Sequence, residues 1–329
     1  MRTDLPRVLK SNGMGLALVI GLALFPFALS LLSGEPVNAG APKFWQGMLA
    51  QVFILAVYAL SYDLLLGITG VLSFGHAMFF GGGAYVAGIL LKHGRWELLP
   101  VVGAVIAVAL LQSLLVGALS LRVKGVYYAM VTLAFAQMFF ILAEASDFRE
   151  FTGAEDGLQG IPVPAWLSPT NERLTFYFVT LAFCLIVYLI AKRVVDSPTG
   201  RILIAIRENE QRAQTVGFNT FAYKLIAMTL AGVLAALAGM MSALWNLSAN
   251  PGMLASGTTI NALLMTIIGG AGTLSGSLLG AGFLQLVGYW LNDAFGPRWP
   301  LLFGLVYIAI VLFLPYGIIG TWRMRRQGR

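Results

Sequence analysis

Runs of about twenty apolar residues recur along this chain, and they restrict its fold more than any other feature. A helix of that length crosses the roughly 30 Å hydrocarbon layer of a bilayer. The composition agrees, since 58% of the 329 residues are hydrophobic, only 11% are charged and the mean hydropathy is +0.82. A soluble domain of this size is far less apolar. We therefore predict an all-α, polytopic integral membrane protein.

The apolar runs divide the chain into predicted membrane helices within a single membrane domain over residues 1–329. The predicted spans cover residues 14–33, 45–66, 76–91, 98–121, 126–143, 174–191, 224–245, 258–268, 278–291 and 301–319. Three of them are short or interrupted by glycine. We predict broken or re-entrant helices there, which protein or a water-filled cavity must cover. The expected number of complete spans is therefore about eight to ten.

The first apolar segment follows a basic start and admits two interpretations. It is either a signal peptide cleaved after Ala39 or a retained first span. Its apolar stretch exceeds the roughly 7 to 15 residues of a signal-peptide core. We therefore predict a retained span.

Charged residues outside the spans predict the orientation of the chain. The basic residues lie near both termini and between the fourth and fifth spans, as Arg2, Arg7, Lys10, Arg122, Lys124, Arg323, Arg325, Arg326 and Arg329. Acidic residues gather between the fifth and sixth spans, as Glu144, Asp147, Glu150, Glu155, Asp156 and Glu172. Because Lys and Arg concentrate in cytoplasmic loops, we predict cytoplasmic N- and C-termini and an extracytoplasmic loop over residues 144–173.

Residues 197–219 mix many charges with an apolar stripe, between two apolar segments. Ser197 followed by Pro198 is a helix start signal, and Gly217 is a stop signal. At about 100° per residue, one face of a continuous helix carries Ile202, Ala205, Ile206, Asn209, Ala213 and Val216. Basic flanking residues predict a cytoplasmic loop over residues 192–224. The stripe fits either a groove on another protein or a surface of lipid headgroups.

Several classes of function lack the residues that they need. The sequence has no G-x-x-x-x-G-K-[ST] phosphate loop and no Gly-Lys dipeptide. Its only histidines are His76 and His93, and its single cysteine, Cys184, excludes a disulfide framework within the chain. We expect no catalytic, metal or cofactor site in this chain. The net charge of +7 is explained by orientation in a membrane and does not imply nucleic acid.

Within the predicted spans, Asp63 and His76 are the informative polar residues, because ionisable groups at membrane depth are costly unless they face protein or water. Two glycine-rich runs, 67–83 and 269–282, allow close helix packing or broken helices. The candidates for a translocation pathway or for helix packing are Asp63, Gly70, Ser73, Gly75, His76, Gly81, Gly269, Gly270 and Gly272. In the packing alternative, Asp63 caps a turn and His76 bonds a backbone carbonyl. An overlay of residues 61–91 on 261–291 matches three glycines, which chance also explains.

Six stretches of the sequence carry a resemblance to a known family. They are LLLGITGVLSFGHAMFFGGGAY (64–85), KGVYYAMVTLAFAQM (124–138), TGAEDGL (152–158), GRILIAIRENEQRAQTVGFN (200–219), GGAGTLSGSLLGA (269–281) and LFLPYGIIG (312–320). Together they resemble the permease subunits of branched-chain amino acid ABC importers, LivM type. Two positions depart from the family pattern, since Asp63 stands where Asn is common and Ser277 where Pro is common.

This resemblance implies a subunit of an importer in the bacterial inner membrane. The amphipathic segment is similar to the coupling helix that docks on an ATPase subunit, so the expected contacts or shapers of that joint are Arg201, Ile202, Ala205, Ile206, Arg207, Glu208 and Gly217. The expected partners are a second homologous permease, two cytoplasmic ATPases, an extracytoplasmic solute-binding protein and membrane lipid. ATP would be used by the ATPases only. Alternative cargoes are urea or short amides, and a stand-alone secondary transporter using Asp63 is a less favoured alternative.

Overall fold

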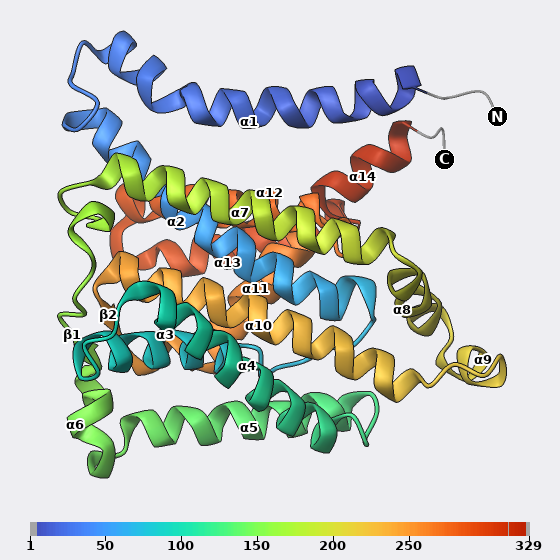
Figure 1. The fold of residues 1–329 in the computed structure, drawn as a ribbon. Helices are drawn as coiled ribbons and strands as arrows, with labels where there is room; N and C mark the ends of the chain where they lie inside the picture. The colour runs from blue at the N-terminus through green and yellow to red at the C-terminus, as the bar shows by residue number, and fades with distance from the viewer. Residues whose placement is uncertain (1–4, 315, 327–329) are drawn as a thin grey trace.

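The structure, a computed structural model, describes residues 5–314 and 316–326 as a helical bundle (Figure 1). The long helices are α1 (Leu5–Ser33), α2 (Gly40–Asp63), α4 (Leu98–Ser120), α5 (Val126–Glu144), α7 (Arg173–Asp196), α10 (Thr220–Asn246) and α12 (Ser275–Phe295). The shorter ones are α3 (Ala77–Lys92), α6 (Arg149–Thr152), α8 (Pro198–Glu208), α9 (Glu210–Thr215), α11 (Ser256–Gly269), α13 (Trp299–Phe313) and α14 (Gly317–Arg326). A π-helical turn, Leu64–Ile68, continues α2.

The apolar runs form the membrane helices that the sequence predicts. Six helical stretches of the described chain are long and apolar enough to cross a bilayer, namely Gly40–Ile68, Leu98–Ser120, Val126–Glu144, Arg173–Asp196, Thr220–Asn246 and Ser275–Thr321. Shorter apolar helices cover Ala17–Ser33, Ala77–Lys92 and Ser256–Gly269. The helical, polytopic membrane architecture is thereby confirmed, and the count of about ten spans stays a prediction.

The two ends of the bundle differ (Figure 1). At one end, which we call the β end, β1 (Leu158–Gln159) pairs antiparallel with β2 (Ser248–Ala249), and α6 lies beside them. At the other, the α8 end, lie α8, α9, the turn 121–125 and the outer tip of α14. The predicted extracytoplasmic loop and the predicted cytoplasmic loop thus lie at opposite ends. Arg2 and Arg329 are outside the described residues.

The short predicted spans over residues 76–91 and 258–268 form α3 and α11, which begin inside the bundle. The extended segment 69–76 leads from the α8 end to α3, and the segment 247–255 leads from the β end to α11. The two helix starts meet, since the backbone N–H of Ala77 donates to Thr259 Oγ1 at 2.9 Å. The predicted span over residues 278–291, which is also short, lies within the continuous helix α12.

The pattern of helix, break and helix occurs twice in opposite directions. The series α2, α3, α4 corresponds to α10, α11, α12, and α12 packs on α2 as α4 packs on α10. The overlay of residues 61–91 on 261–291 is not this correspondence, because it aligns α3 with α12. An inverted repeat of this kind, with interrupted helices near its centre, is typical of transporters.

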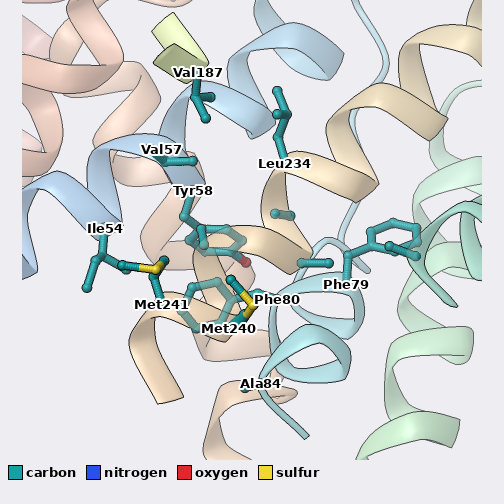
Figure 2. Close-up of a cluster of buried hydrophobic side chains, with 14 of the residues drawn as sticks. Ile54, Val57, Tyr58, Phe79, Phe80, Ala84, Val187, Leu234, Met240 and Met241 are labelled. Atoms are coloured by element: carbon teal, nitrogen blue, oxygen red, sulfur yellow. The ribbon is translucent and has the colours of Figure 1, made fainter. Parts of the chain in front are cut away.

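The core of the bundle lies where α2, α3 and α10 cross. Tyr58 of α2, Phe80 of α3 and Met240 of α10 pack together there (Figure 2), and each is at most 4% exposed. Glycines make the crossing close, since a Cβ on Gly83 would meet the backbone of Ala236. Small residues at helix crossings are the usual means of close packing in membranes.

Candidate functional site

The predicted start of the charged helix is confirmed. Ser197 is the N-cap of α8, and its Oγ accepts a hydrogen bond from the backbone N–H of Gly200 at 3.3 Å. Pro198 occupies the first helical position, where the missing N–H has no intrahelical partner in any case. The local sequence is therefore sufficient to begin the helix.

The prediction of one continuous helix from Ser197 to Gly217 is wrong. The helix stops at Glu208, and Asn209 adopts an extended conformation with φ −159° and ψ 100°. The Asn209 side chain accepts from the backbone N–H of Arg212 at 2.9 Å and caps a second short helix, α9. Asparagine competes with the helical backbone in this way, so the apolar stripe is not one straight face. Gly217, with φ +98°, follows α9 as predicted.

The inner face of α8 and α9 packs on the bundle. Leu203, Ile206 and Ala213 are buried, with 3%, 3% and 6% of their surfaces exposed. Leu203 lies outside the predicted apolar stripe. The buried face of α8 differs from that stripe because α8 packs against both α7 and α10. Ile206 is covered by its own chain, so it can shape the predicted joint but not touch a partner. Ile202 is half-buried.

The outer face of α8 and α9 is exposed and hollowed. A depression of about 190 Å³ is lined by Ala205, Glu208, Asn209, Arg212, Ala213, Val216 and Phe218. Four of the predicted contacts are exposed on α8, namely Arg201, Ala205, Arg207 and Glu208. We call this face the α8–α9 surface. It presents charge of both signs around an apolar hollow.

Arg207 is exposed as well, but its guanidinium reaches toward the bundle. Its Nη1 donates to the backbone carbonyl of Gly67 in the π-helical turn. An added Cβ on Gly70 would lie 2.8 Å from Arg207 Cγ, and one on Gly272 would lie 2.8 Å from Arg207 Nη1. The Arg207 side chain therefore reaches between the two glycine-rich turns, although Arg207 was predicted at the joint with the ATPase.

Asp63 holds the second of these turns. Its Oδ1 accepts from the backbone N–H of Gly272 at 2.6 Å, and its Oδ2 accepts from that of Leu274 at 3.0 Å. The turn needs glycine, because Gly270 has φ +111° and Gly269 lies against the backbone of Gly276. Asp63 thus caps a turn, as the packing alternative describes. Its role in translocation stays a prediction.

His76 is buried among aromatic rings at the start of α3. Its ring stacks on Tyr58 with a centroid distance of 5.5 Å. Its Nε2 lies 2.8 Å from Ser61 Oγ, so the predicted backbone acceptor is wrong. Because the Ser61 hydroxyl donates to the carbonyl of Tyr58 at 2.7 Å, it accepts from His76, which places the proton on Nε2.

The remaining pathway candidates lie in close-packed surroundings. Ser73 Oγ accepts from the Gly75 N–H at 3.3 Å, and a Cβ on Gly75 would meet the backbone of Thr132. A Cβ on Gly81 would meet Leu254 in the segment before α11. These contacts favour helix packing, while contact with cargo stays a prediction for each residue.

Glu210 anchors α9 to the α8 end of the bundle, a role that no local sequence pattern indicates. Its carboxylate pairs with Lys224 of α10 at 2.8 Å and with Lys124 of the α4–α5 turn at 3.5 Å, and it accepts from Thr220 Oγ1 at 3.2 Å. Partial burial raises the pKa of Glu210, but the hydrogen bond and charge of Lys224, the charge of Lys124 and the hydrogen bond of Thr220 together lower it more. The pKa therefore lies below its usual value.

This anchor predicts a pH-dependent α9. A lowered folded-state pKa stabilises the folded state above pH about 4.5, and that stabilisation is lost as the pH falls through the lowered pKa. We expect Glu210→Gln to cost about 1 kcal/mol, or about fivefold in amide protection of α9 at pH 7. Hydrogen exchange, corrected for intrinsic rates, measures this effect. In Glu210→Gln, the amide protection of α9 should not fall further when the pH is lowered. The exposed control Glu208→Gln should lose protection at low pH as the wild type does. Equal protection of α9 at pH 7 in wild type and Glu210→Gln would refute the anchor.

The described residues hold no group of three or more His, Cys, Asp or Glu side chains close enough to bind a metal ion. In these residues, the surface helix α8 is instead joined through Arg207 to the two helix breaks. With the inverted repeat, this defines a multi-pass membrane protein of the transporter class.

Comparison with known proteins identifies the family. Residues 45–315 match the family described as branched-chain amino acid transport system / permease component, and the chain belongs to this family. It is 26% identical over 300 residues to the high-affinity branched-chain amino acid transport system permease protein LivM of Salmonella typhimurium, covering 83% of this chain and 69% of that protein. A probable LivM of Methanocaldococcus jannaschii is 26% identical over 335 residues, covering 92% and 93%.

A second group of relatives matches a shorter part. The autoinducer 2 import system permease protein LsrC of Photorhabdus laumondii is 30% identical over 178 residues, covering 51% of this chain and 50% of that protein. The predicted resemblance is confirmed, and the chain is a multi-pass permease component of the bacterial inner membrane.

Proposed function

We propose that this chain is the permease subunit of a binding-protein-dependent importer, and that it forms the pathway for branched-chain amino acids with a second permease. The α8–α9 surface carries the proposal, because it is exposed outward and anchored inward on the helices of the bundle. We propose that two ATPase subunits dock on this surface and its counterpart. The α8 end would then face the cytoplasm, and the β end would receive the solute-binding protein.

The energy for uphill transport would come from these partners. A chain without a nucleotide site moves solute uphill only if another subunit changes the free-energy difference between its conformations. Closure of the ATPase pair on ATP would displace α8 and α9 as rigid bodies, and hydrolysis would reset them. This chain would bind no cofactor itself.

The secondary-transporter alternative is weakened by the surroundings of Asp63. That mechanism needs an intramembrane carboxylate that exchanges an ion or proton, and Asp63 was the clear candidate. Both of its oxygens accept backbone hydrogen bonds from the turn before α12. Ion exchange there would break the turn in every cycle.

Reconstituted uptake tests the proposal. In proteoliposomes containing both permeases, the ATPases and the binding protein, radiolabelled leucine should accumulate only with ATP on the ATPase side. Excess isoleucine should compete, whereas urea and acetamide should not. Accumulation driven by a proton or sodium gradient without the ATPases would refute the proposal, and competition by urea alone would refute the cargo.

A further inference from the structure

We propose that Arg207 is a positioning residue whose guanidinium transmits the movement of α8 to both helix breaks, and that this contact, not docking on the ATPase, is its main task. This inference rests on the proposed function and assigns one residue a task within it.

The end of α2 offers Arg207 a hydrogen-bond acceptor. The last carbonyls of a helix lack intrahelical partners and carry partial negative charge. The N–H groups of Gly70 and Val71 bond the carbonyls of Leu66 and Leu65, at 3.2 and 2.9 Å. Gly67 receives the guanidinium of Arg207 instead. A cation on α8 thus caps the C-terminal end of a membrane helix.

Two glycines leave the space that the Arg207 side chain occupies. Gly70 and Gly272 have φ of +75° and +81°, so both positions favour glycine by conformation. Both also border Arg207 so closely that any Cβ would displace it. The two glycines come from different halves of the inverted repeat, and Arg207 occupies the gap between their turns.

Asp63 links α2 to the second helix break, the turn between α11 and α12. Asp63 lies one helical turn before Gly67, and its carboxylate holds the N–H groups of Gly272 and Leu274. A displacement of α8 therefore acts on the end of α2 through Gly67 and on the α11–α12 turn through Asp63. Each of these hydrogen bonds involves a charged group, which makes it stronger than a neutral one.

Arg207 and Glu208 are best replaced one at a time. Single substitutions separate the transmission of movement by Arg207 from the docking of the ATPase at Glu208, and a double substitution would not. We expect Arg207→Ala to keep ATPase binding and ATP hydrolysis within about twofold of wild type, while uptake per ATP falls by about tenfold or more, the size of a typical coupling term. Glu208→Ala on the α8–α9 surface should instead weaken ATPase binding. Exposed Arg193→Ala at the end of α7 is the matched control and should match the wild type.

The measurements are co-purification of the ATPases, phosphate release and leucine uptake in the same proteoliposomes. Loss of ATPase binding in Arg207→Ala, or uptake per ATP within twofold of wild type, would overturn the inference. Should Arg207→Ala fail to fold, Arg207→Lys is the second variant, because it keeps the charge and a donor nitrogen. It should give intermediate uptake per ATP with normal ATPase binding. Uptake per ATP equal to that of the wild type in Arg207→Lys would contradict the inference. A wild-type chain that binds no ATPase would refute the proposed function itself, a separate result.

Discussion

Replacing Gly83 by valine is expected to prevent normal assembly of the bundle. An added Cβ at this position would overlap the backbone of Ala236 on α10, and one at Gly239 would overlap the carbonyl of Phe80 on α3. Backbone cannot move aside as a flexible side chain can, so α3 and α10 would have to separate. We expect Gly83→Val and Gly239→Val each to destabilise the protein by about 3 kcal/mol or more, at the upper end for overpacked cores.

Gly103→Val is the matched control for these variants. Gly103 also lies in an apolar membrane helix, but an added Cβ there meets no atom within 4 Å. Thermal unfolding of the detergent-solubilised protein, followed by fluorescence-detected size exclusion, measures the difference. We expect the control to unfold with the wild type and the two core variants to aggregate at much lower temperature. A Gly83→Val protein that unfolds with the control would refute the close α3–α10 crossing.

Asp63→Leu is expected to have the second-largest effect. The change keeps much of the side-chain volume but removes both acceptors, so the N–H groups of Gly272 and Leu274 lose their partners inside the protein. An unsatisfied buried donor costs about 1 to 3 kcal/mol, which gives about 2 to 6 kcal/mol for the pair. Asp63→Asn keeps one acceptor oxygen and should cost less.

The order of the Asp63 variants is the sharper test of the turn. Unfolding temperature should fall from wild type to Asp63→Asn to Asp63→Leu, and Asp293→Leu, at an exposed position near the end of α12, should change it little. Limited proteolysis should cut the α11–α12 turn of Asp63→Leu first. Equal stability of Asp63→Leu and wild type would mean that the carboxylate does not hold this turn.

The membrane helices were predictable because twenty apolar residues have few other stable states in a cell. The Ser197-Pro198 start was predictable for a similar reason, since its hydrogen bonds are local. Ser277 lies in the first turn of α12, where proline is also tolerated, so this departure from the family pattern leaves the helix unchanged.

The features that sequence reasoning missed depend on contacts between distant segments. The direction of the Arg207 guanidinium is set by Gly67, 140 residues away, and the partners of Glu210 come from helix α10 and from the turn between α4 and α5. Periodicity places residues on a helix face but does not reveal which face a partner covers, so Ile206 and Leu203 were misassigned. The break at Asn209 had a local signal, its capping side chain, which the apolar stripe outweighed in the prediction.

The most direct test of the account labels one position on α9 from each side of the membrane. Gln211 is exposed on the α8–α9 segment, and the native Cys184 is 4% exposed and buried in the bundle. A membrane-impermeant maleimide should modify Gln211→Cys in inside-out vesicles but not in intact cells, and bound ATPase should protect it. Modification of Gln211→Cys from outside intact cells would contradict the account, because α8 and α9 could then not be moved by a cytoplasmic ATPase.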